Sequence, residues 1–104
     1  MKKIIFLHQA EQEMNEAAIF YDTHSQGLGR EFLSAIKKGT DDIAHKPTAY
    51  PIQRNGIRRR LVRRFPYGIL YCEEEEQIVI IAVMHLHRAP DYWRHRVSEQ
   101  TVNW

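Results

Sequence analysis

The 104-residue sequence contains one cysteine and no long hydrophobic run. A single cysteine excludes a disulfide within the chain, and with it a disulfide-stabilised secreted scaffold. No stretch reaches the roughly 20 apolar residues that a membrane-spanning helix needs. The apolar residues 4–7 are too few for a signal peptide, and glutamates follow them at once. We therefore expect a cytoplasmic protein in which Cys72 is a small core residue rather than a nucleophile.

Glycine and proline are scarce, with five and four residues, while 43% of the chain is hydrophobic and 27% is charged. This composition is typical of a globular domain and excludes a disordered chain. No internal repeat, linker or low-complexity segment interrupts the sequence. We therefore interpret residues 1–104 as one domain with a modest hydrophobic core.

Acidic residues are absent from the middle third of the chain. Residues 43–72 contain seven basic residues and no acid, and so carry +7, whereas residues 1–42 carry −2 and residues 73–104 carry −3. Six of the seven bases are arginine, whose guanidinium group binds carboxylates and phosphates through paired hydrogen bonds. The segment therefore indicates a surface for phosphate or for an acidic protein segment, with a solvated basic strand as the alternative.

Five arginines stand together in IRRRLVRRFPYGILY, residues 57–71. We expect a strand at about 57–65, in which alternate side chains point to opposite faces. Leu61 and Phe65 then share the buried face, and the arginines at even positions share the other. The two arginines at odd positions fall on the apolar phase, a misfit that indicates a site rather than a plain solvated face. The candidate partner-binding residues are Arg58, Arg59, Arg60, Arg63 and Arg64.

The hydrophobic periodicity predicts an α+β domain. Residues 50–56 fit a loop or a frayed edge strand. The expected strands are residues 3–8, 57–65, 67–72 and 78–85. The expected helices are residues 9–24 and 28–45, which form a helical hairpin. After the N-terminal strand and the hairpin, a three-stranded antiparallel meander completes one sheet, and a short helix or tail follows Pro90.

Three segments, in this order, resemble the RelE/ParE toxin superfamily of bacterial type II toxin–antitoxin systems. They are AIFYDTHSQGLGREF at 18–32, RRFPYGILY at 63–71 and VMHLHRAPDYWRHR at 83–96. They are most similar to the ParE branch, often called plasmid stabilisation proteins. The resemblance implies a twisted antiparallel sheet packed by a helical hairpin. It also implies a toxin held silent in a hetero-oligomer by a cognate antitoxin, whose acidic, partly disordered segment wraps over it.

The resemblance leaves two mechanisms open. ParE-like toxins inhibit DNA gyrase and arrest growth without catalysing a reaction. RelE-like toxins cut messenger RNA on the ribosome, which requires a base, an acid and cations for the phosphate. The candidate catalytic residues for the second mechanism are Arg60, Arg63, Arg64, His85, His87, Arg88 and Tyr92. RelE-like toxins have a lysine-rich surface, whereas the helices here are acidic to neutral, so we favour the ParE-like mechanism.

The spacing of His85 and His87 on a strand puts both rings on one face, as two metal ligands would require. No third ligand is evident, so we expect no metal and no other cofactor, and a structural role for the histidines. Trp93, Tyr67 and Tyr71 are expected in the core. A non-toxic nucleic-acid-binding or adaptor domain is a third hypothesis, because the basic strand alone fits it.

Overall fold

The computed structural model describes residues 1–100 as one five-stranded sheet with three helices. The strands are β1 (Lys3–Phe6), β2 (Ile52–Arg54), β3 (Ile57–Leu61), β4 (Tyr67–Glu73) and β5 (Gln77–His85). The helices are α1 (His8–His24), α2 (Leu28–His45) and α3 (Arg94–Gln100). The sheet order is β1-β5-β4-β3-β2, with β1 parallel to β5 and every other pair antiparallel. The predicted α+β fold class is confirmed.

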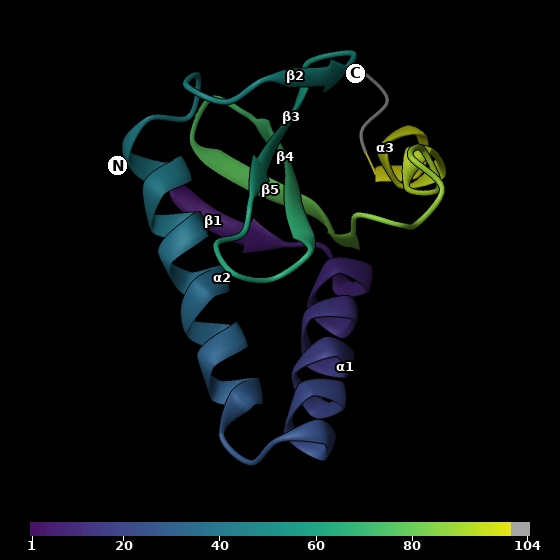
Figure 1. Cartoon of the computed structure of the whole chain (residues 1–104). Helices are drawn as coiled ribbons and strands as arrows, with labels where there is room; N and C mark the ends of the chain where they lie inside the picture. Colours follow the sequence, from purple (N-terminus) through teal and green to yellow (C-terminus); the bar gives the residue numbers. More distant parts are fainter. Residues whose placement is uncertain (101–104) are drawn as a thin grey trace.

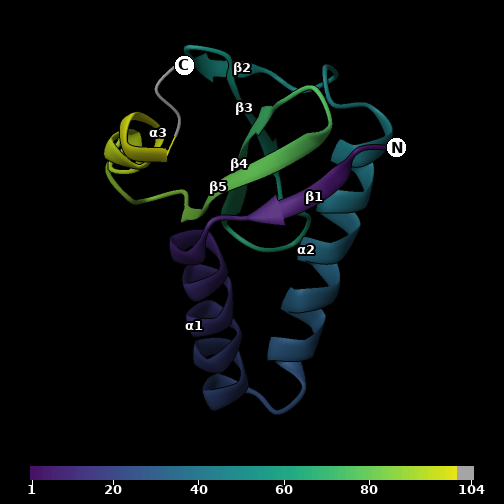
Figure 2. The same cartoon turned by 180° about the vertical axis from the view of Figure 1, so that it is seen from behind.

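The helical hairpin of α1 and α2 packs against the sheet and extends beyond it, as both views show (Figures 1 and 2). The C-terminal segment with α3 lies beside the sheet, and its Arg96 side chain reaches Glu13 on α1. No helix in residues 1–100 is long and apolar enough to cross a membrane.

The hairpin forms because its two helices bury complementary faces. α1 contributes the small buried residues Ala10, Ala17 and Ala18, and α2 contributes an apolar stripe. At the start of α2, Gly29 donates its backbone N–H to the Asp22 carboxylate at 2.7 Å. A Cβ atom on Gly29 would lie only 2.3 Å from the Ala18 carbonyl oxygen, so only glycine permits this close approach.

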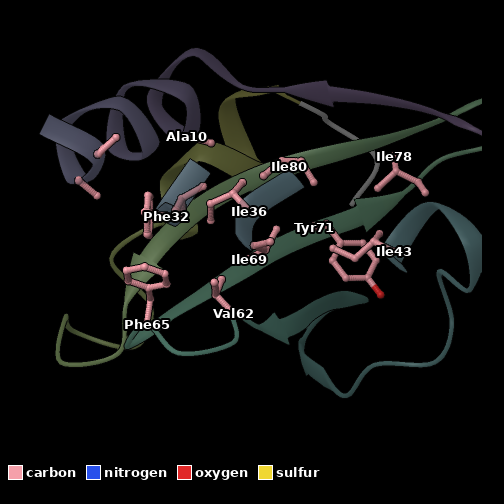
Figure 3. Close-up of a cluster of buried hydrophobic side chains, with 13 residues drawn as sticks. Ala10, Phe32, Ile36, Ile43, Val62, Phe65, Ile69, Tyr71, Ile78 and Ile80 are labelled. Carbon is pink, nitrogen blue, oxygen red and sulfur yellow. The ribbon is translucent and has the colours of Figure 1, made fainter. Parts of the chain in front are cut away.

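The sheet separates two clusters of buried side chains. The cluster beneath the hairpin includes Ala10, Phe32, Ile36, Ile43, Val62, Phe65, Ile69, Tyr71, Ile78 and Ile80 (Figure 3). The cluster on the opposite face, which we call the outer face, consists of Ile57, Leu70, Val79, Ile81, Ala82, Met84 and Trp93. Burial of Tyr71 and Trp93 and partial burial of Tyr67 confirm their predicted place in the core. Cys72 is partly buried against the outer cluster.

Several predicted boundaries were wrong. The arginine strand ends at Leu61 rather than at residue 65, because the chain then turns, with Arg64 in a left-handed conformation at φ 69°. Of the two alternatives expected at residues 50–56, a loop or a frayed edge strand, the structure has the edge strand: residues 52–54 form β2, a fourth strand after the hairpin. β1 ends at Phe6 because α1 begins at His8. The predicted bounds of α2 were correct.

We predict that Gly29→Ala lowers the free energy of unfolding by about 2 kcal/mol, because the added methyl group separates the two helices. For a domain of this size, that loss corresponds to a fall of roughly 10 °C in Tm. Calorimetry or denaturant unfolding measures the effect. Ser34→Ala, at an exposed site on the same helix, is the control and should change stability by less than about 0.5 kcal/mol. Equal stability of Gly29→Ala and wild type would contradict the close packing.

Candidate functional site

β3 is held between two turns that position its arginines. Asn55 and Gly56 have φ values of 47° and 80°. These are the left-handed conformations of a two-residue Asn-Gly hairpin, which joins β2 to β3. The second turn, residues 62–66, brings the chain back into β4 and contains Arg64. The five arginines therefore lie partly on a strand and partly on a turn.

The faces of β3 are the reverse of those expected. Arg58 pairs with Tyr71 and Arg60 pairs with Ile69, and both partners belong to the cluster beneath the hairpin. Residues directly opposite each other on paired strands share a face, so Arg58 and Arg60 lie on the hairpin side. Leu61, expected in the core, lies on the outer face and is 51% exposed. The register between β3 and β4, which pairs Arg58 with Tyr71 and Arg60 with Ile69, therefore sets which side chains of β3 face the hairpin.

Arg60 is tied into the fold. Its guanidinium forms an ion pair with Asp42 on α2, and its side chain is 11% exposed. Hydrogen bonds from Arg60, and then from Lys38, hold the pKa of Asp42 below its ordinary value. The guanidinium also lies 5.7 Å from the centre of the Tyr50 ring, and the side chain passes close to Gly39. A guanidinium so engaged is not free to bind a partner.

The other arginines differ in how far they are engaged. Arg58 donates to a backbone carbonyl oxygen at 2.7 Å. Arg64 pairs with Glu31 at 2.7 Å, but both side chains are exposed, and such pairs contribute little stability. Within residues 1–97, the guanidinium groups of Arg59 and Arg63 make no hydrogen bond or ion pair. Arg59 on the outer face and Arg63 on the turn are therefore the available cations, together with the loosely held Arg64.

A second group of predicted residues surrounds one pocket. His85, Arg88 and Tyr92 line a cavity of about 260 Å³ between α1 and the ends of β4 and β5. Its other lining residues are Glu13, Glu16, Ala17, Phe20, Tyr67 and Val83. The ring of His85 lies 5.1 Å, centre to centre, from that of His87, and its Nδ1 accepts the His87 backbone N–H at 3.1 Å. The pocket lining does not include Arg60, Arg63 or Arg64.

A buried polar network closes the base of this pocket. The Glu13 carboxylate accepts two hydrogen bonds from Arg96, each of 2.9 Å, and one from the Tyr92 hydroxyl at 2.5 Å. It also accepts the backbone N–H of Val83, while Arg96 donates to the carbonyl oxygen of Ile81. The side chains of Arg96 and Glu13 are only 8% and 16% exposed. The network therefore joins α1, β5 and the C-terminal segment.

The Tyr92 hydroxyl is poorly suited to act as a base. Burial and the hydrogen bond to Glu13 raise the pKa of Tyr92, so the hydroxyl stays protonated at neutral pH. Its ring is flanked by the guanidinium groups of Arg88 and Arg96, at 4.0 Å and 5.0 Å from the ring centre. In this arrangement Tyr92 serves as a packing and hydrogen-bonding group.

Sequence reasoning missed Glu13 and Arg96. Glu13 follows buried Ala10 by three residues and precedes buried Ala17 by four, so an acid stands next to the apolar stripe of α1. An acid in that position predicts a partly buried carboxylate, which needs a basic or hydrogen-bonding partner. The partner itself was not readable, because Arg96 lies 83 residues further along the chain.

The chemistry of the remaining candidates is limited. No group of three or more His, Cys, Asp or Glu side chains in the part of the chain that the structure describes is arranged to hold a metal ion. Burial raises the pKa of the Cys72 thiol to about 11, and the nearby negative charges of Glu74 and Glu73 raise it in the same direction to a smaller extent. The thiol is therefore protonated at neutral pH and is a poor nucleophile.

The comparison with protein families agrees with the fold. Residues 4–90 match the family described as the ParE toxin of the type II toxin–antitoxin system, parDE. The chain belongs to the ParE toxin family. A solved structure of the chromosomal ParDE system from P. aeruginosa is similar to this ParE toxin, with a TM-score of 0.61 and 13% identity. That likeness, which shows the fold alone, covers 82% of this chain and 96% of the other. No curated protein matched the sequence.

We predict that Asp42→Asn destabilises this ParE toxin by about 2 kcal/mol at pH 7, because Arg60 keeps a charge with no carboxylate partner. The folded-state pKa of Asp42 is depressed. The stabilisation is therefore present above the ordinary aspartate pKa and is lost as the pH falls through the lower, folded-state pKa. Unfolding at pH 7 and below pH 4 measures both effects.

The stability difference between wild type and Asp42→Asn should shrink in acid. Asp41→Asn, at a neighbouring exposed carboxylate that pairs with Lys37, serves as the control. A difference that is independent of pH would show that the ion pair is not formed.

Proposed function

We propose that this ParE toxin arrests growth by binding and inhibiting DNA gyrase, and that a cognate antitoxin neutralises it. The observation that carries the proposal is the match of residues 4–90 to the ParE toxin family. In this proposal the protein acts by docking to its target rather than by cutting a substrate.

The arrangement of the arginines supports docking. Arg63 and Arg64 lie on an exposed turn at one end of the sheet, and Arg63 has no internal partner within residues 1–97. Exposed guanidinium groups on a turn reach a partner's carboxylates without first breaking a buried pair. Arginine is also over-represented among the residues that dominate protein–protein binding energies.

The same charge supports an antitoxin with an acidic segment. Residues 43–72 carry +7 and contain no acid, so this region attracts an anionic chain over the distance of a Debye length. Arg59 and Arg63 can each donate two parallel hydrogen bonds to one carboxylate. We infer a hetero-oligomer of toxin and antitoxin held in part by these pairs.

The pocket around His85, Arg88 and Tyr92 favours one alternative, a RelE-like ribonuclease. However, Glu16 lines the same pocket, and its carboxylate repels the phosphate that must be cut. The Tyr92 hydroxyl is also committed to Glu13. These contacts favour inhibition by binding. The third hypothesis, a non-toxic nucleic-acid-binding domain, predicts salt-dependent binding to bulk DNA or RNA and no growth arrest.

We predict that Arg63→Ala with Arg64→Ala abolishes growth arrest and weakens gyrase inhibition at least tenfold, about 1.4 kcal/mol. Induced expression, with DNA breaks, the SOS response and messenger RNA integrity scored together, measures this outcome. The control, Arg30→Ala with Lys46→Ala, removes the same charge from exposed sites elsewhere and should keep full toxicity. Unchanged arrest by the folded Arg63/Arg64 variant would exclude the turn from the site.

We predict that Tyr92→Phe keeps growth arrest and DNA breaks, because the proposed mechanism does not use the hydroxyl. The loss of its hydrogen bond to Glu13 should cost about 1 kcal/mol of stability. A ribonuclease that depends on Tyr92 would instead lose message cleavage. Truncated messages with wild-type toxin that disappear in the folded variant would favour the RelE-like alternative over our proposal.

A further inference from the structure

The outer face of the sheet is only partly covered. The C-terminal segment buries Trp93 in the outer cluster, which protects Ile57, Leu70 and Ile81. The cover does not extend over the ends of β3 and β5. There Leu61 is 51% exposed and Leu86 is 38% exposed, so two large apolar side chains remain in contact with water.

Gly68 brings these side chains together with Arg59. Leu61 pairs with Gly68 across β3 and β4. A Cβ atom on Gly68 would lie 3.0 Å and 3.1 Å from the Cδ and Cγ atoms of Arg59, and 3.6 Å from a methyl carbon of Leu86. The aliphatic part of Arg59 therefore lies over the glycine with Leu86 beside it. We call Arg59, Leu61, Gly68 and Leu86 the outer-face patch.

The patch combines an apolar surface with an unpaired cation. Within residues 1–97, the Arg59 guanidinium makes no hydrogen bond or ion pair. Arg59 and Leu61 are two residues apart on one strand face, which places them about 6–7 Å apart. A partner segment that matches both needs an apolar and an acidic side chain at a similar spacing. Positions i and i+4 of a helix, with Cβ atoms about 5–6 Å apart, meet this need.

We propose that the outer-face patch is a docking site for the antitoxin. An apolar antitoxin side chain packs on Leu61 and Leu86, and a carboxylate binds Arg59. This inference rests on the proposed function, since it assigns a surface to the antitoxin named there. Charge complementarity favours an acidic protein segment, because the Arg59 guanidinium makes no ion pair within residues 1–97 and its own stretch of sequence, residues 43–72, contains no acid. The two leucines favour a protein over a nucleic-acid partner, because exposed apolar side chains make no favourable contact with a charged phosphate backbone.

Two variants and a matched control test the inference. Leu61→Ser with Leu86→Ser removes the apolar part of the patch, and Arg59→Gln removes its charge. The control, Leu33→Ser with Arg30→Gln, makes one change of each kind on α2, where Leu33 is 39% exposed. All the substituted leucines are exposed, so folding should be preserved. Calorimetric titration with the purified product of a small open reading frame beside the gene, the expected source of the antitoxin, gives Kd, and induced expression gives growth arrest.

We expect each patch variant to weaken antitoxin binding at least tenfold and the control to change Kd by less than about twofold. Arg59→Gln should also reduce the salt dependence of binding. The Leu61/Leu86 variant should still arrest growth but escape the antitoxin. Wild-type Kd for both patch variants would overturn the inference and leave the proposed function intact. Loss of gyrase inhibition with normal antitoxin binding would also overturn it, by assigning the patch to the target.

The proposed function fails in a recognisably different way. In that case wild-type protein neither arrests growth nor binds the neighbouring gene product, before any substitution is made. The inference then falls with the function on which it rests.

Discussion

The ion pair between Arg60 and Asp42 is the interaction on which the arrangement of charge depends. It joins β3 to α2 and keeps one arginine of the +7 segment away from solvent. A guanidinium that lies under the helical hairpin needs a carboxylate there, since an unpaired buried charge is costly. Arg58 lies on the same side of β3 as Arg60, whereas Arg59 lies on the outer face and Arg63 and Arg64 lie on the exposed turn. The basic segment is therefore a small number of separate binding groups rather than one continuous ridge.

Much of the fold could be predicted from the sequence. The bounds of α2 followed from its apolar stripe and from Pro47, because helical periodicity and tertiary burial agree there. The end of β3 could not be predicted, because it depends on the left-handed backbone of Arg64, which arginine rarely adopts. All three residues of the short strand β2 are exposed, so no buried apolar face marks it in the sequence, and a loop and a frayed edge strand were both compatible with the pattern there.

The candidate site was less predictable, for two physical reasons. Alternation along β3 shows which side chains share a face but not which face is buried. The pairing of Arg60 with Ile69 and the approach of α2 decide that point. The network of Glu13, Tyr92 and Arg96 depends on contacts 79 and 83 residues apart in the chain. Sequence spacing carries no information on such contacts.

The central claim is that the arginines form two groups: those that are held by contacts within the fold, and those whose guanidinium groups can bind a partner. Hydrogen exchange of the arginine Nε–H groups, followed by NMR in the free toxin and in its complex with the antitoxin, tests it most directly. The Nε atoms of Arg60 and Arg96 are buried, so their protons should exchange slowly in both states. Those of Arg59 and Arg63 should exchange fast in the free protein and slow in the complex. Fast exchange at Arg60, or no change at Arg59 and Arg63 on binding, would contradict the account.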